Sequence, residues 1–339
     1  MKKKTIKINF KYFYEGFNQE KNIFTDILRK KYNVVISEYP DYMFYSVYQN
    51  VGKIRDISGK GDLIRKISPK LYILARKIYS KLNNPKRELI APEGDFIKIL
   101  YSAENKKPDM EKCDWALSSY FEEEINHPNY FRLPPTIMCN YPIEVKLPLK
   151  RKINFNKIKK EKTEFCNFIY SQDINNRNSF FKELSKYKKI DAPGRCMNNM
   201  SQISNSSPRS SRVSKDWVET KLNFLKPYKF TIAFENKIKN GWTTEKLTHP
   251  LFMNSVPIYV GNKQIGRDFN TKCFINYNDF KNMEEFIKHI ISVDKDDELY
   301  RQYLEQPIFN NTKQHYFNSN ERIAEILYSI IENEKKIYK

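Results

Sequence analysis

The sequence predicts an α/β protein with two domains, and three observations lead to that prediction. The chain has 339 residues, more than a single hydrophobic core usually encloses, so two domains are expected. Strand-like and helix-like segments alternate along the chain, which is typical of layered α/β architectures. The hydrophobic fraction is 40%, with 23 Tyr and 23 Phe, which is enough to form compact cores.

In the first half, apolar or β-branched runs predict strands and amphipathic runs predict helices. The predicted strands cover residues 5–10, 34–36, 43–47 and 96–101, and the predicted helices cover 23–31 and 63–82. Residues 144–162 are basic and lack apolar periodicity, which indicates a solvated crossing between domains. We therefore place the domain boundary near Lys150.

The second half begins with a predicted β-α-β unit, made of a strand over 165–170, a helix over 178–188 and a strand over 189–191. The Ser- and Arg-rich run over 201–215 predicts a surface loop. A strand over 230–234, a helix over 244–255 and a strand over 256–260 follow. Three further helices are predicted over 283–293, 297–305 and 318–335.

The formal net charge of +20 is compatible with three classes of protein. These are a nucleic-acid binder, a protein at an anionic membrane and an enzyme that handles phosphorylated substrates. The five cysteines show no CxxC spacing, so they indicate neither a zinc site nor a disulfide framework. We expect a cytoplasmic protein, with the basic run 146–162 as the candidate for peripheral contact with the inner face of an anionic membrane.

The stretch from 228 to 262 carries the most chemistry. Glu235, Asn236, Glu245 and Lys246 stand at the end of one predicted strand and the start of the next helix. In open α/β sheets, ligands bind in the crevice at that edge. Glu245 could accept from the two hydroxyls of a ribose, whereas the alternative interpretation is an ordinary capping glutamate beside a solvated lysine.

An N-cap at Thr243 or Thr244 would point the first amides of the helix at an anion such as a pyrophosphate. Lys246 would add a mobile positive charge beside the same anion. This is the environment that a departing nucleoside diphosphate requires.

The motif FEN, five residues, an aromatic residue, two more residues and EK, followed by VPIYVG, resembles the donor motif of alpha-1,3-fucosyltransferases. Upstream, FCNFIYSQDINNRNSFFKELSKYKKIDAPGR resembles the family segment with a donor-contacting arginine, here Arg177. The segments YSAENKKPDM, CDWALSSYF and YFRLP resemble the end of the acceptor domain. The resemblance covers roughly residues 90–310 and is greatest to bacterial enzymes that fucosylate surface glycans.

The resemblance implies a GT-B architecture, in which two Rossmann-like domains face a central cleft. It places an acceptor-binding domain at 1–150, a domain for GDP-fucose at 151–316 and a C-terminal helix at 317–339 that packs back on the first domain. It implies that Glu104 is the general base, although the residue alone fits a solvent-exposed glutamate at a strand end equally well. It also implies donor-binding roles for five residues: Arg177, Asn236, Trp242, Glu245 and Lys246.

The implied reaction is inverting transfer of L-fucose from GDP-β-L-fucose to a hydroxyl of an acceptor glycan of GlcNAc type, in α-1,3 linkage. The partners would be a GDP-sugar donor and an oligosaccharide or glycoconjugate acceptor. The donor half lacks a DxD-type pair at a strand end, so we expect no obligatory metal or other cofactor.

Two departures keep the donor sugar open. Trp242 and Thr243 stand where bacterial relatives often have Tyr and Val, so another nucleotide-sugar donor for the same fold remains the main alternative. A basic nucleic-acid-binding protein is the alternative from another class. Because no recognised binding module occurs in the sequence, we expect no specific nucleic-acid partner.

Overall fold

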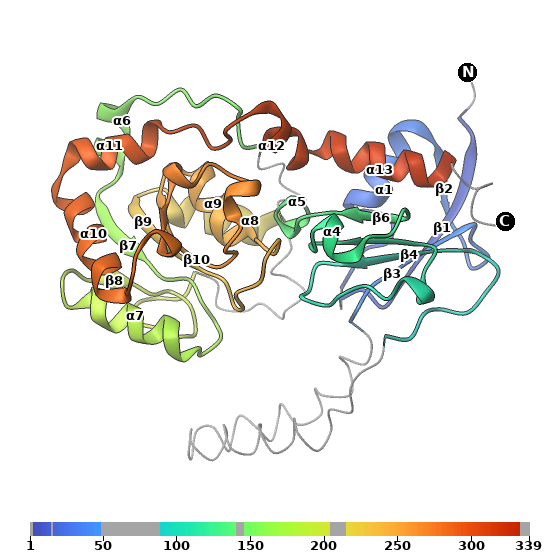
Figure 1. Cartoon of the computed structure of the whole chain (residues 1–339), viewed down its shortest axis with the longest axis horizontal. Helices are drawn as coiled ribbons and strands as arrows, with labels where there is room; N and C mark the ends of the chain where they lie inside the picture. Colours follow the sequence, from blue (N-terminus) through green and yellow to red (C-terminus); the bar gives the residue numbers. More distant parts are fainter. Residues whose placement is uncertain (1–2, 15, 49–88, 140–145, 204–214, 333–339) are drawn as a thin grey trace, which may run out of the picture.

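The computed structural model of the chain describes residues 3–14, 16–48, 89–139, 146–203 and 215–332. They form two parallel β-sheets, one in each half of the chain, with helices packed around them (Figure 1). The predicted helix over 63–82 and most of the predicted loop over 201–215 lie outside the described residues. The α/β prediction is confirmed.

Six parallel strands make up the first sheet, in the order β2-β1-β3-β4-β5-β6. Every residue of β3 is buried, as expected for a strand that is covered on both faces. Asn22 caps the first helix, α1 (Ile23–Lys31), because its side chain accepts from the amides of Phe24 and Thr25. The strands are β1 (Thr5–Lys11), β2 (Asn33–Ile36), β3 (Tyr42–Tyr45), β4 (Ile97–Ser102), β5 (Trp115–Ser118) and β6 (Tyr130–Arg132).

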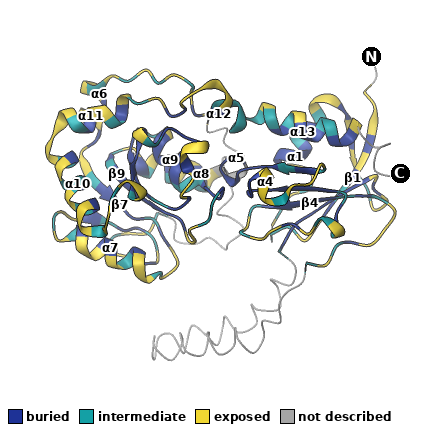
Figure 2. Ribbon diagram, in the orientation of Figure 1, coloured by how far each residue is buried: buried dark blue, intermediate teal, exposed yellow. Residues whose placement is uncertain are grey.

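Five parallel strands make up the second sheet, in the order β11-β10-β9-β7-β8. Figure 2 shows buried strands at the centre of this half and exposed outer faces on its helices. The strands are β7 (Glu164–Asn167), β8 (Ile190–Asp191), β9 (Tyr228–Phe234), β10 (Val256–Val260) and β11 (Ile275–Asn276). The helices are α7 (Asn175–Ser185), α8 (Lys215–Leu225), α9 (Glu245–Phe252), α10 (Met283–Lys295) and α11 (Asp297–Glu305).

The predicted helix over 318–335 corresponds to α13 (Asn320–Glu332), and a short helix that was not predicted, α12 (Thr312–Phe317), precedes it. Helix α13 returns to the first sheet and packs beside α1 (Figure 1). Ile323 and Ile330 are fully buried in the same core as Ile8. The Tyr42 hydroxyl donates to the carbonyl oxygen of Ile331 at 3.1 Å. The last helix thus shares the hydrophobic core of the first sheet.

The predicted crossing over 144–162 is partly helical, because residues 155–161 form α6 (Phe155–Glu161) behind the cap Asn154. Lys162 is buried, and its ammonium donates to the carbonyl oxygens of Lys226 at 2.6 Å and Met253 at 2.7 Å. Burial lowers the pKa of Lys162 to about 7. The expected full solvation fails at this lysine because the fold brings two distant carbonyl groups to it. Two short helices, α4 (Glu122–Ile125) and α5 (Pro135–Cys139), lie in the first half.

Candidate active site

The connection from β9 to α9 contains a buried carboxylate. Glu235 directly follows β9, and its side chain is 0% exposed. The backbone amide of Thr244 donates to Glu235 Oε1 at 2.8 Å, and the Thr244 hydroxyl lies 2.9 Å from both carboxylate oxygens. Lys246 Nζ lies 3.3 Å from Glu235 Oε2. Glu235 therefore joins the end of β9 to the first turn of α9.

Thr244 is the N-cap of α9, and its Oγ1 accepts from the amide of Lys246. Of the two threonines that the sequence offers for this role, the structure uses the second. Gly261, just after β10, permits the close packing of this region. A Cβ atom at Gly261 would lie 2.4 Å from the Tyr259 hydroxyl and 2.8 Å from Glu235 Cγ, so a larger residue would force these side chains to shift.

The two glutamates around Lys246 differ in their electrostatics. Burial raises the pKa of Glu235 above its ordinary value. Burial acts on Glu245 in the same direction, but the ammonium groups of Lys246 at 3.8 Å and Lys221 at 3.9 Å hold its pKa well below the ordinary value. Glu245 is therefore ionised at neutral pH, and its carboxylate can accept from ligand hydroxyl groups.

Arg177 lies in the first turn of α7, because this helix begins at Asn175 and not at the predicted residue 178. Its guanidinium stacks on the Tyr170 ring at 3.6 Å from the ring centroid. Nη1 donates to Asn236 Oδ1 at 3.1 Å and Nη2 donates to the Gln172 carbonyl at 2.6 Å. The Nε atom is buried and has no hydrogen-bond partner among the described residues.

Four of the five predicted donor residues form two contacting pairs. Arg177 contacts Asn236, and Lys246 contacts Glu245. The pairs are connected because Asn236 is the neighbour of Glu235, to which Lys246 binds. Tyr170 and Lys246 also line the same small cavity, of about 20 Å³. The structure thus gathers four of the five predicted donor residues at the carboxyl end of the second sheet.

Trp242, the fifth, lies against the first domain. Its indole Nε1 donates to the carbonyl oxygen of Ala103 at 2.8 Å, just beyond the end of β4. The next residue, Glu104, is exposed, and its Oε1 accepts from the Tyr48 hydroxyl at 3.1 Å. The loop that follows β9 therefore reaches the carboxyl end of β4, and Glu104 borders this loop.

Glu235 lies within the FEN motif, but the sequence assigned it no specific role. The available signal was a carboxylate at a strand end, nine residues before a threonine that can cap a helix; in the structure the backbone amide of Thr244 donates to this carboxylate. Tyr170 gave no signal, because its stacking on Arg177 arises only in the fold. Among the described residues, no group of three or more His, Cys, Asp and Glu side chains could hold a metal ion.

Comparison with known proteins identifies related chains. The family model for glycosyltransferase family 10 (fucosyltransferase), C-terminal part, matches residues 158–337. The model for the alpha-(1,3)-fucosyltransferase FucT N-terminal domain matches residues 8–55. The two matches lie in the two halves of the chain, which supports a relationship over both sheets.

Two relatives show similarity at the level of sequence. A protein of Acanthamoeba polyphaga mimivirus described as a fucosyltransferase is 35% identical over 162 residues, 48% of this chain and 27% of the relative. Alpha-(1,3)-fucosyltransferase FucT of Helicobacter pylori is 26% identical over 270 residues, 70% of this chain and 53% of that enzyme. The chain thus spans about a quarter to a half of the length of these relatives.

The crystal structure of an alpha1,3-fucosyltransferase with GDP has the same fold. It superposes with a TM-score of 0.67 at 20% identity, over 99% of this chain and 92% of that one. The predicted GT-B architecture is thereby confirmed. With more than half of its length matched by the family model, the chain belongs to glycosyltransferase family 10, the fucosyltransferases.

Proposed function

We propose that this protein transfers L-fucose from GDP-β-L-fucose to a hydroxyl of an acceptor glycan of GlcNAc type, in α-1,3 linkage and with inversion. The cluster of Glu235, Glu245 and Lys246, with Arg177 beside it, carries the proposal. It combines fixed cations, an ionised carboxylate and a helix N-terminus at the edge of a parallel sheet where nucleotides bind. Membership of the family supports the same donor, as does a structural neighbour solved with GDP-fucose.

In the proposed reaction, the acceptor oxygen attacks the anomeric carbon of fucose from the face opposite the GDP group. The carbon–oxygen bond to the β-phosphate breaks, and its electron pair stays on the phosphate. Glu104 takes the proton of the acceptor hydroxyl, a contribution of ~100 to ~10,000-fold. Arg177 and Lys246 stabilise the growing negative charge of the GDP leaving group. Glu245 accepts from the ribose hydroxyls.

Incubation of the purified protein with a panel of GDP-, UDP- and CMP-sugars and GlcNAc-containing acceptors tests the proposal. We expect selective use of GDP-fucose and loss of transfer in Glu104→Gln. The matched control is Glu111→Gln. Glu111 is also exposed, but it precedes β5 and therefore lies toward the amino ends of the strands, away from Glu104 at their carboxyl ends. Use of a different donor would identify a same-fold glycosyltransferase with another sugar, and no transfer from any donor would reject the activity.

The acceptor is the second unknown of the proposal. One relative, from Xenopus tropicalis, is named GDP-fucose protein O-fucosyltransferase 3, and it is 32% identical over 139 residues, 40% of this chain and 28% of the relative. A folded protein acceptor should therefore accompany the oligosaccharides in the panel. If fucose is found on the protein and not on the glycans, the proposed acceptor changes from a glycan to a protein.

We also propose a cytoplasmic location with peripheral contact at the inner face of an anionic membrane. Lys157 and Lys160 are exposed on α6, within the basic run. No helix in the described part of the chain has the length and apolar character to span a bilayer. Sedimentation with phosphatidylserine vesicles tests the contact, which should weaken in a Lys157→Glu/Lys160→Glu variant. We expect no specific binding to nucleic acid in a parallel gel-shift assay.

A further inference from the structure

The loop between β9 and α9 lies against the backbone of the first domain. Gly241 has a φ of +76°, and a Cβ atom there would lie 2.3 Å from the carbonyl oxygen of Ser119. Only glycine satisfies both conditions without a shift of one domain. The adjacent residue, Trp242, donates to Ala103. The loop that precedes Lys246 is thus hydrogen-bonded to Ala103, the residue before Glu104, and lies against the backbone of Ser119.

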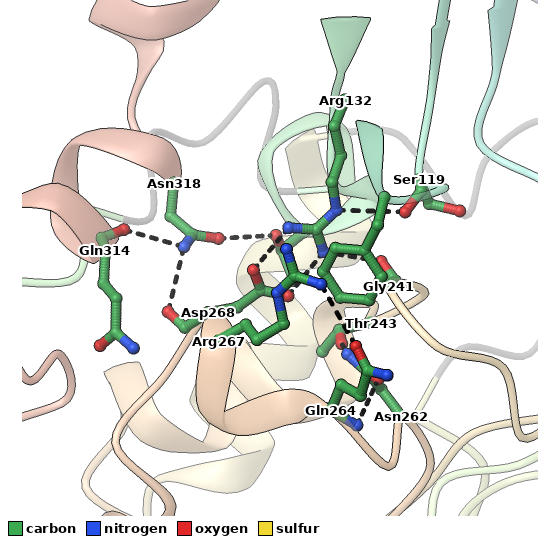
Figure 3. Close-up of polar contacts among 12 residues, drawn as sticks. Ser119, Arg132, Gly241, Thr243, Asn262, Gln264, Arg267, Asp268, Gln314 and Asn318 are labelled. Atoms are coloured by element: carbon green, nitrogen blue, oxygen red, sulfur yellow. Dashed lines mark hydrogen bonds and ion pairs between the residues drawn. The ribbon is translucent and has the colours of Figure 1, made fainter. Parts of the chain in front are cut away.

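A buried ion pair spans the two domains beside this loop (Figure 3). Arg132, the last residue of β6, donates through Nη1 and Nη2 to the two carboxylate oxygens of Asp268, both at 2.7 Å. The side chains of Arg132 and Asp268 are 5% and 2% exposed. Arg132 Nη2 also donates to the Gly241 carbonyl and Nε donates to the Ser119 carbonyl, both at 3.2 Å.

This geometry fixes both the distance and the direction between the domains. A bidentate guanidinium–carboxylate pair holds two groups in one plane, and burial removes the competition of water. The guanidinium of Arg132 contacts the backbone on both sides of the interface, at Ser119 and at Gly241. Any change in domain spacing would therefore break several hydrogen bonds at once.

A second pair that crosses the interface provides a contrast. Arg267, the neighbour of Asp268, pairs with Glu123, but these side chains are 47% and 62% exposed. Exposed pairs are screened by water and contribute little to geometry. The buried pair therefore restrains the spacing more strongly than this exposed pair.

We propose that Arg132, Asp268 and Gly241 are positioning residues, which fix the domain spacing at the donor loop and thereby the distance from Glu104 to the bound donor. This inference rests on the function proposed above. It assigns no contact with substrate to these residues. They act through Ala103 and Trp242, whose hydrogen bond joins the two halves of the site.

Two variants disturb the spacing by different means. Asp268→Asn removes the charge of the pair, and Gly241→Ala inserts a methyl group between the loop and Ser119. We expect kcat for fucose transfer to fall about 100-fold, the cost of a displacement of roughly 1 Å between reacting groups.

The affinity for GDP, measured by calorimetry, should be retained because Arg177, Glu245 and Lys246 all lie in the second domain. Crystal structures of the variants should show a distance from Trp242 Nε1 to the Ala103 carbonyl oxygen longer than the 2.8 Å of the wild type. The control Glu123→Gln, which removes the exposed pair, should match the wild type.

Wild-type kcat in both folded variants would overturn the inference, and so would a loss of kcat that follows a loss of GDP affinity. If Asp268→Asn does not fold, Gly241→Ala decides, because it leaves both charges in place. If the wild-type protein does not use GDP-fucose, the proposed function fails, and the distance between Trp242 and Ala103 in the variant structures tests the spacing separately. An unchanged distance in both variants would then reject the role of these residues in the spacing, and an increase would support it.

Discussion

The two halves of the proposed site hold their charged groups in different ways. In the second domain, Lys246 lies between Glu235, whose side chain is 0% exposed, and Glu245. In the first domain, Glu104 is exposed and accepts from the hydroxyl of Tyr48. The donor half is thus built into the folded core, whereas the proposed base is not. We infer that substitutions in the donor half change both stability and activity, while substitution of Glu104 changes activity alone.

Lys246→Met should cause the largest loss of stability. It removes the ammonium 3.3 Å from Glu235 Oε2 and leaves a buried carboxylate without its cation. Removal of one partner from a buried ion pair costs about 3–5 kcal/mol, so the free energy of unfolding in a urea titration should fall by that amount. Lys288→Met, at an exposed pair with Glu284, should leave it nearly unchanged. Equal effects of the two variants would contradict the comparison.

The two glutamates beside Lys246 should give opposite pH dependences. The native state holds the proton of Glu235 more tightly than the unfolded chain, so its contribution to stability is full below pH 4.5 and is lost as the pH rises through the native pKa. For Glu245 the native pKa is lowered, so its contribution is full above pH 4.5 and is lost as the pH falls. Glu235→Gln and Glu245→Gln should remove these slopes.

The measurement is the free energy of unfolding of the wild type and of each variant, from about pH 3 to about pH 7. Relative to Glu235→Gln, the wild type should lose stability as the pH rises. Relative to Glu245→Gln, it should lose stability as the pH falls. Slopes of the same sign would mean that burial and the two lysines, Lys246 and Lys221, do not shift the pKa values of Glu235 and Glu245 in opposite directions.

Thr244→Ala should have an intermediate effect. The variant loses the cap of α9 and the hydroxyl 2.9 Å from both oxygens of Glu235. Loss of a threonine cap costs about 1–2 kcal/mol, which thermal unfolding should reveal. Thr220→Ala is the control, because Thr220 is exposed on α8 and donates to the carbonyl of Asp216. If the Thr244→Ala protein is as stable as this control, the cap does not contribute to the stability of the donor half.

The sequence predicted most strands of the two sheets, but it missed β5, β6 and β11. The strands β1 and β9 have seven residues each, enough for their apolar pattern to be recognised. The strands β5 and β6 have four and three residues and were missed, although β2 and β8, with four and two residues, were predicted. Length alone therefore does not explain the difference; the segments that contain β5 and β6 were interpreted by resemblance and not by their apolar pattern. Helix α8 was also missed, because it directly follows the polar run that predicted a loop.

The same distinction applies to the site. Glu245 and Lys246 were predicted because they lie close in sequence to the strand end and the cap of one helix. The pair of Arg132 and Asp268 spans 136 positions, and no local pattern connects its members. The stacking of Arg177 on Tyr170 likewise depends on where α7 begins relative to β7. Local chemistry was thus predictable, whereas contacts between elements required the fold.

Glu104→Gln should have the smallest effect on stability and provides the sharpest test of the comparison. The side chain is exposed, and the amide oxygen of glutamine can still accept from the Tyr48 hydroxyl, so thermal unfolding and GDP affinity should equal those of the wild type. Transfer should nevertheless fall by ~100 to ~10,000-fold, because an amide cannot take the proton of the acceptor. If GDP affinity or stability falls together with transfer, Glu104 belongs to the supporting structure of the site and the base must be sought elsewhere.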